Sequence, residues 1–274
     1  TMNYKNMGDE PYMLKANLGD VPVIVDVDRI RAANFAISKY GVDTVILDDG
    51  FQQWKIAKDL EIVTIDANNP LGNRNLLPRG ILREPLSSLR RADLFVLTKT
   101  NLCTDTDIEK IKDELNKLNS KGLVIGSVHK PLGFYNIDKP EELFNGESLK
   151  EKTVTLFSGV GDPDSFEKLI TSTGIKIGLS FRFSDHHNYK KCDLDRIIKG
   201  SRDKFIDTII TTQKDAARLY DLRLILRQAR DTSVKDTERS RSATYDLRLL
   251  VLRIELAIKD EQIFYNRLLK PYSL

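Results

Sequence analysis

Residues 42–52 read V-D-T-V-I-L-D-D-G-F-Q, an apolar run that ends in two adjacent carboxylates and a glycine. The apolar part, residues 42–47, predicts a strand buried on both faces, as in the middle of a parallel sheet. Asp48 and Asp49 follow at its carboxyl end, where open α/β sheets bind their ligands. The two carboxylates repel each other, and a magnesium ion on a nucleotide phosphate would relieve that repulsion. The alternative is a turn that only closes a strand.

The composition is typical of a soluble globular protein. The chain has 274 residues, enough for one large or two ordinary domains, with 41% hydrophobic and 30% charged residues. It contains no apolar run of about 18 residues, and its polar start does not resemble a signal peptide. A net charge of +3 gives no argument for a nucleic-acid partner. Cys103 and Cys192 lack metal or redox spacing, which favours a reducing cytoplasm and argues against zinc.

Strand and helix patterns alternate along the first 130 residues. Strands are expected at 21–26, 42–47, 60–66, 93–98 and 123–128, and helices at 12–17, 29–40, 86–91 and 106–121. Residues 69–85 form a loop rich in glycine and proline. This alternation predicts parallel crossover units in a doubly wound sheet. We therefore assign residues 1–130 to a first α/β domain.

A second, smaller α/β domain is predicted at residues 153–274, after a weakly periodic linker at 131–152. Its strands are expected at 153–157, 176–183, 207–212 and 249–258, and its helices at 164–172 and 194–203. The motif Y-D-L-R-L occurs twice, beginning at Tyr220 and at Tyr245. The polar residues 227–244 between the copies predict a mobile insert. A basic nucleic-acid-binding arm is the alternative, but acidic residues dilute its charge.

Four polar clusters coincide with predicted strand ends or turns. They are G-D-E-P at 8–11, D-D-G-F-Q at 48–52, R-E-P at 83–85 and S-D-H-H at 184–187. Each also has an ordinary explanation. Asp9 could cap a helix, Arg83 and Glu84 could form a surface ion pair, and His186 could be solvated. A histidine beside an aspartate, however, suits a general base or a charge stabiliser.

The order and spacing of the motifs resemble those of the tetraacyldisaccharide 4'-kinase family, whose members phosphorylate the lipid A disaccharide precursor. The resemblance covers residues 8–219 and resumes near Leu249. Its most specific part is L-L-P-R-G-I-L-R-E-P at 76–85, because no generic nucleotide-binding fold requires it. The matching motifs are G-D-E-P, D-D-G-F-Q, G-N-x-x-L-L-P-x-G-x-L-R-E-P-L, F-S-G-V-G-D-P-x-x-F, F-S-D-H-H-x-Y and T-T-x-K-D-A-x-R-L.

The resemblance implies a P-loop-type doubly wound parallel sheet, a second, smaller α/β domain and a two-stranded linker. It also implies ATP and Mg²⁺ as cofactors. Asp48 and Asp49 match the acidic pair that handles Mg²⁺, so both are expected to bind metal and cofactor. Arg83 and Glu84 match a loop that shapes the phosphate and substrate side of the cleft, and are also expected to bind the cofactor.

Asp9 and His186 match the family's catalytic pair. Asp9 is expected near the attacking sugar hydroxyl, and His186 is expected to raise the basicity of Asp9. Phosphoryl transfer needs a group that receives the hydroxyl proton, and an oriented carboxylate supplies one. The implied substrate is an acylated disaccharide lipid, bound through peripheral contact at the cytoplasmic face of the bacterial inner membrane.

The chain departs from the family in one important respect. The Walker A motif G-x-x-x-x-G-K-[ST] is absent from its sequence. We therefore expect an N-terminally truncated kinase that transfers little phosphate by itself, and that also lacks the family's membrane-facing helix. Gln53 and Trp54 stand where the family often has a histidine. A non-catalytic remnant that binds the acylated sugar and an unrelated α/β nucleotide-binding regulator are the alternatives.

Overall fold

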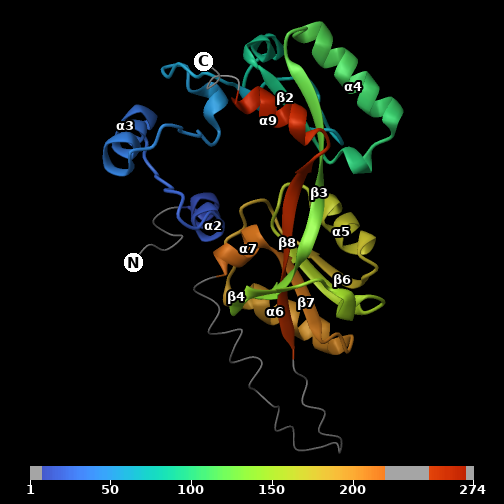
Figure 1. Ribbon diagram of the computed structural model, residues 1–274. Helices are drawn as coiled ribbons and strands as arrows, with labels where there is room; N and C mark the ends of the chain where they lie inside the picture. The colour runs from blue at the N-terminus through green and yellow to red at the C-terminus, as the bar shows by residue number, and fades with distance from the viewer. Residues whose placement is uncertain (1–7, 220–246, 270–274) are drawn as a thin grey trace, which may run out of the picture. The chain divides into compact units, whose positions relative to one another are not determined.

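The computed structural model describes residues 8–219 and 247–269, which divide into two compact units (Figure 1). The described residues of Thr1–Asp26 and Pro131–Ile254 form one, called here the His186 unit. Those of Val27–Lys130 and Glu255–Leu274 form the other, the Asp48 unit. Two long strands belong to both units, β3 (Leu123–Asn136) and β8 (Arg248–Ile258).

The Asp48 unit contains a parallel sheet of β1 (Ile62–Asp66), β2 (Leu94–Thr98) and the first half of β3. The apolar run of β2 lies in the middle of this sheet and is buried along almost its whole length. Helix α4 (Asp105–Leu118) packs a regular apolar stripe into the same core. Its other helices are α3 (Arg29–Tyr40), η1 (Gly50–Gln52), η2 (Leu86–Arg91), η3 (Thr100–Leu102) and α9 (Glu261–Leu269).

The His186 unit contains four parallel strands in the order β8-β7-β5-β6. They include β5 (Thr153–Ser158), β6 (Lys176–Arg182) and β7 (Thr208–Thr212). The carboxyl ends of parallel strands lie at one edge of a sheet, and the loops after β5, β6 and β7 meet there. The helices of the unit are α2 (Asp9–Asn17), η4 (Glu147–Leu149), α5 (Pro163–Ser172), α6 (Lys191–Asp203) and α7 (Gln213–Arg218). The predicted α/β class is confirmed.

The two units divide the chain differently from the predicted domains. Residues 131–152 are not a linker, because the second half of β3 pairs there with the antiparallel strand β4 (Lys139–Phe144). Helix α2 belongs with the second predicted domain, and α9 belongs with the first. Sheet pairing and helix packing between distant parts of the chain cause both differences.

Two predicted strands are wrong. Residues 21–26 and 42–47 form no strand, and neither pairs with another segment among the described residues. The side chain of Ile46 is 91% exposed, and Val25 and Val45 are exposed as well. A strand needs a neighbour for its backbone hydrogen bonds, and β-branched residues alone do not supply one.

Smaller differences concern the ends of elements. Helix α2 begins at Asp9 rather than at Tyr12, and Gly8 is its N-cap, so Asp9 is not the capping residue. Residues 227–244 and both tyrosines of the repeated motif lie outside the described residues. In the part of the chain that is described, no helix is long and apolar enough to cross a bilayer.

The exposure of Ile46 gives a direct test of this correction. We expect Ile46→Ala to change the free energy of unfolding by less than about 0.5 kcal/mol, as for an ordinary surface site. Leu97→Ala in the core of β2 should cost about 2–5 kcal/mol, because it removes a buried side chain and leaves a cavity. Urea unfolding of both variants measures the two values. A loss of unfolding free energy in Ile46→Ala as large as that in Leu97→Ala would show that Ile46 is buried, as the predicted strand requires.

Candidate active site

His186 lies in the loop after β6, beside the carboxyl end of β5. Its backbone has a left-handed φ of 57°, a conformation in which histidine is enriched among residues with a side chain. Its amide donates hydrogen bonds to the carbonyl of Gly159 at 3.2 Å and to Oδ1 of Asp185 at 3.0 Å. A Cβ on Gly159 would lie 3.1 Å from the carbonyl oxygen of Ser184, so glycine permits this close approach.

A buried polar cluster supports this loop from below. Asp215, at the start of α7, is completely buried, and Arg218 is 5% exposed. The Asp215 carboxylate accepts hydrogen bonds from Thr212 Oγ1 at 2.7 Å, Tyr189 Oη at 2.9 Å, the Gly159 amide at 3.0 Å and Arg218 Nη1 at 3.2 Å. Burial raises the pKa of Asp215, and the four donors oppose that rise. The Arg218 guanidinium beside the carboxyl favours its ionised form.

Arg218 connects this cluster to the imidazole ring. Its Nη1 donates to the Gly159 carbonyl at 2.8 Å, and its Nη2 lies 3.1 Å from Nδ1 of His186. Lys214 lies on the other side of the ring, with Nζ 3.5 Å from Nε2. The same ammonium forms an ion pair with Glu10 at 2.9 Å. The ring therefore has a cationic side chain next to each of its nitrogens.

Glu10 is the second residue of α2, which packs on α7 (Figure 1). A hydrogen bond of 3.3 Å between Gln213 Nε2 and Asn17 Oδ1 joins the two helices a second time. Asp9 immediately precedes Glu10, and Lys214 links Glu10 to His186. The structure thus places the first turn of α2 and the His186 loop in one neighbourhood of the same unit.

The neighbouring histidine has a different environment. Nε2 of His187 lies 3.1 Å from Oδ2 of Asp193, and its ring stacks on Phe183 with centroids 4.6 Å apart. The His187 ring therefore packs at the edge of the core. Of the two adjacent histidines, His186 is the more exposed and the one beside α2.

The motif D-D-G-F-Q meets the motif L-R-E-P inside the Asp48 unit. Asp49 has a left-handed φ of 53°, and its carboxylate forms an ion pair with Arg83. Glu84, 10% exposed in its side chain, accepts hydrogen bonds from Arg91 Nη2 at 2.9 Å and Trp54 Nε1 at 3.3 Å. The Asp49–Arg83 pair thus joins two motifs more than 30 residues apart, and Glu84 binds the flanking residues Trp54 and Arg91.

The turn after Asp49 is held by further cations. Lys58 donates to the carbonyls of Gly50 at 2.9 Å and Gln53 at 3.3 Å. The guanidinium of Arg91 lies 4.4 Å from the centre of the Phe51 ring, and donates to the Phe51 carbonyl at 3.2 Å. This local network keeps the turn in one conformation.

Asp48 differs from Asp49 in its contacts. Its side chain is exposed and makes no hydrogen bond or ion pair with any described residue. No group of three or more His, Cys, Asp or Glu residues that could hold a metal occurs in residues 8–219 and 247–269. Mg²⁺ commonly takes only one or two carboxylates together with phosphates and water. Asp48 and Asp49 fit such a partial set of ligands.

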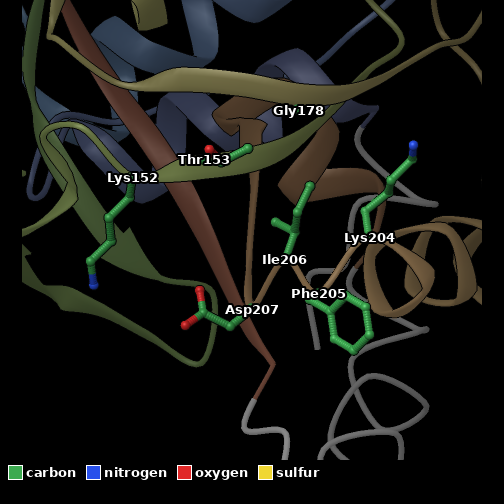
Figure 2. A pocket seen from close by; sticks show the side chains of 7 residues that line it. All are labelled: Lys152, Thr153, Gly178, Lys204, Phe205, Ile206 and Asp207. Carbon is green, nitrogen blue, oxygen red and sulfur yellow. The ribbon is translucent and has the colours of Figure 1, made fainter.

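A cavity of the His186 unit lies away from these residues. It has a volume of about 460 Å³ and lies at the amino ends of β5 and β7, the opposite edge of the sheet from His186 (Figure 2). Its lining residues are Lys152, Thr153, Gly178, Lys204, Phe205, Ile206 and Asp207. No predicted site residue lines this cavity.

Sequence reasoning gave no role to several residues that build these sites. Lys214, Asp215 and Arg218 belong to the quoted motif T-T-x-K-D-A-x-R-L, but their contacts with His186 are only visible in space. Arg91 and Trp54 were likewise without a role. The only sequence signal for Lys214, Asp215 and Arg218 was that they follow the carboxyl end of a strand, β7.

The environment of Glu84 predicts a pH-dependent contribution to stability. Burial raises its pKa, but hydrogen bonds from Ser88, Arg91 and Trp54 outweigh this and bring the pKa below its ordinary value of 4.5. A lowered folded-state pKa stabilises the protein above the unfolded value and is lost as the pH falls through the folded one. Glu84→Gln should therefore cost about 1.5–3 kcal/mol at pH 7, and progressively less below about pH 4.5.

Urea unfolding at several pH values measures this difference. Glu109→Gln is the matched control, because Glu109 forms an exposed pair with Lys112 on α4 of the same unit. It should cost little at any pH. A cost at Glu84 that is equal at pH 7 and pH 3.5 would show that the ionised carboxylate is not what stabilises the loop.

Comparison with known proteins identifies the family of the chain. The family model described as tetraacyldisaccharide-1-P 4'-kinase matches residues 1–272. Tetraacyldisaccharide 4'-kinases from Halothermothrix orenii and Elusimicrobium minutum are each 35% identical, over 260 and 215 residues. The alignments cover 92% and 78% of this chain, and 64% and 56% of those relatives.

A solved structure gives the same result at the level of the fold. The crystal structure of LpxK from Aquifex aeolicus in complex with ATP superposes with a TM-score of 0.65 and 25% identity. The match covers 98% of this chain and 70% of that one. The chain therefore spans about two thirds of the proteins it matches. By its family model, its relatives and its fold, this chain belongs to the tetraacyldisaccharide 4'-kinase family.

Proposed function

We propose that this chain carries the acceptor-activating and magnesium-handling residues of a kinase that phosphorylates the 4'-hydroxyl of tetraacyldisaccharide 1-phosphate with ATP. Family membership supports the reaction, and the ATP complex of the Aquifex aeolicus protein supports the phosphate donor. The observation that carries the proposal is the position of His186. It lies at the carboxyl ends of parallel strands, beside the helix that begins with Asp9.

In this proposal Asp9 receives the proton of the sugar hydroxyl as the oxygen attacks the γ-phosphate. A carboxylate can do so when it lies within hydrogen-bonding reach of the hydroxyl and a second group orients it. His186 is that second group. Lys214 adds a positive charge in the same neighbourhood, where negative charge from the phosphates would accumulate.

In the Asp48 unit, Asp48 and Asp49 would hold magnesium. The ion, when bound with ATP, neutralises phosphate charge. Arg83 holds the Asp49 carboxylate in place and presents a cation on the same surface. Glu84 is assigned a supporting part in cofactor binding, because its own carboxylate is engaged with Arg91 and Trp54 and fixes the loop that carries Arg83.

The acyl chains of the proposed substrate lie in a bilayer. We therefore place the reaction at the cytoplasmic face of the bacterial inner membrane, reached by peripheral contact. A non-catalytic protein that binds the same acylated sugar is the second candidate.

The catalytic pair is tested by double substitution. Because the chain covers 64% of the Halothermothrix orenii relative, the assay uses a chimera with that relative's amino-terminal part ahead of this chain. Asp9→Ala and His186→Ala should each lower kcat by about 10²-fold or more. If the two act as one unit, the double variant should be hardly slower than the slower single variant. Transfer of labelled γ-phosphate to the disaccharide measures kcat.

His129→Ala serves as the matched control and should leave kcat unchanged, because it removes an imidazole that is assigned to neither site. Multiplicative losses at Asp9 and His186 would contradict the pair. A chimera that binds the disaccharide but transfers no phosphate would support the non-catalytic candidate instead.

The magnesium assignment is tested on the 274-residue chain through its single tryptophan. Trp54 donates to Glu84, so its fluorescence should respond to changes around the Asp49–Arg83 pair. With ATP present, Asp48→Asn should raise the Mg²⁺ concentration for half of the change about tenfold, which corresponds to ~1.4 kcal/mol. Asp43→Asn, a nearby exposed acid, should not shift the titration. Equal curves for the Asp48 variant and the unsubstituted chain would exclude Asp48 as a ligand.

A further inference from the structure

The contact between Arg218 and His186 determines where the imidazole carries its proton. A guanidinium has only N–H donors and no acceptor. Its Nη2 lies 3.1 Å from Nδ1 of His186, which is ordinary hydrogen-bond distance. Nδ1 must therefore be the acceptor, and the proton of the neutral ring lies on Nε2.

Arg218 is itself held rigidly. Its other terminal nitrogen, Nη1, donates to the Gly159 carbonyl at 2.8 Å and to Asp215 Oδ1 at 3.2 Å. The same Gly159 carbonyl accepts the His186 amide at 3.2 Å. One peptide group thus fixes both the backbone of the histidine and the side chain that faces its ring.

The contacts at Nε2 are longer than the 3.1 Å contact at Nδ1. Lys214 Nζ, at 3.5 Å, is also a donor, so it does not bond to a protonated Nε2. Oδ2 of Asp185 lies 3.8 Å away, beyond hydrogen-bond distance. Neither contact places a proton on Nδ1, so both are compatible with the Nε2 proton that the Arg218 contact requires.

We propose that Arg218 is a positioning residue that holds His186 in the tautomer protonated at Nε2. In this tautomer the ring acts as a hydrogen-bond donor through Nε2 and not as a base. Asp215 in turn positions Arg218. The motif T-T-x-K-D-A-x-R-L thereby acts through the histidine rather than on the substrate. The inference rests on the proposed role of His186. It assigns the proton-receiving role to the carboxylate of the pair, because Nδ1 is occupied and Nε2 is protonated.

Nitrogen-15 NMR of the 274-residue chain, with labelled histidine and arginine, tests the proposal at pH 8 without any assay of activity. His186→Gln assigns the His186 signals among the three histidines. We expect one tautomer, with a proton on Nε2, and a coupling across the hydrogen bond between a guanidinium Nη and Nδ1. A proton on Nδ1, or no such coupling, would overturn the proposal even if the protein proves to be a kinase.

Substitution tests the cause. Arg218→Met should abolish the coupling and make the ring a mixture of tautomers, seen as convergence of its two nitrogen frequencies. If that variant does not fold, Arg218→Lys retains a charge for Asp215 but is too short to bridge to Nδ1, and should give the same change. An unchanged His186 spectrum in a folded variant of either kind would overturn the proposal.

Two controls separate positioning from general damage. Arg182→Met removes an arginine of the same unit that binds Glu167 at 2.8 and 2.7 Å, and should leave the His186 signals unchanged. Tyr189→Phe removes one hydrogen bond from Asp215 while leaving Arg218 in place, and should keep the single tautomer. Loss of the tautomer in Tyr189→Phe would show that the ring depends on the whole cluster and not on Arg218.

Discussion

Asp215 and Arg218 form an ion pair that is removed from water at the carboxyl ends of β5 and β7. Removing one partner of a buried pair typically costs about 3–5 kcal/mol, because the other charge is left uncompensated. The cost of taking the Asp215 carboxylate out of water is offset by additional donors, since the carboxylate also accepts hydrogen bonds from Thr212, Tyr189 and the Gly159 amide. The pair therefore joins the loops that follow three different strands, and the position of His186 depends on it.

Ion pairs also hold the loops of the Asp48 unit, but nearer to its surface. Arg83 pairs with Asp49, and Arg91 pairs with Glu84, so these two acidic residues each have a cation as a neighbour. The Glu84 side chain is only 10% exposed, whereas both partners of the Arg83 pair are exposed, so the Arg83 pair contributes less to stability. This difference suits a loop that is rigid at its base and open toward a ligand. Asp48 remains on the exposed side of the turn.

Sequence patterns correctly predicted the strands that are buried on both faces of the sheet. The runs around Val96, Leu156 and Ile210 are buried on both faces, and each is an inner strand of a parallel sheet. The same pattern around Ile46 did not produce a strand. Its residues have strand propensity, but no described segment supplies the neighbouring backbone that a sheet requires.

The sequence by itself determined the α/β class, the motif order that indicates the family, and His186 and Asp48 as candidates, because periodicity and strand-end acids are local features. Only the tertiary structure decided that residues 131–152 join a sheet, that α2 packs on α7, and that Arg218 faces the Nδ1 atom of His186. Those arrangements depend on contacts between residues tens to almost two hundred positions apart. Such contacts cannot be read from periodicity or spacing within a segment. The chemical roles of these groups could therefore be assigned only from the folded structure.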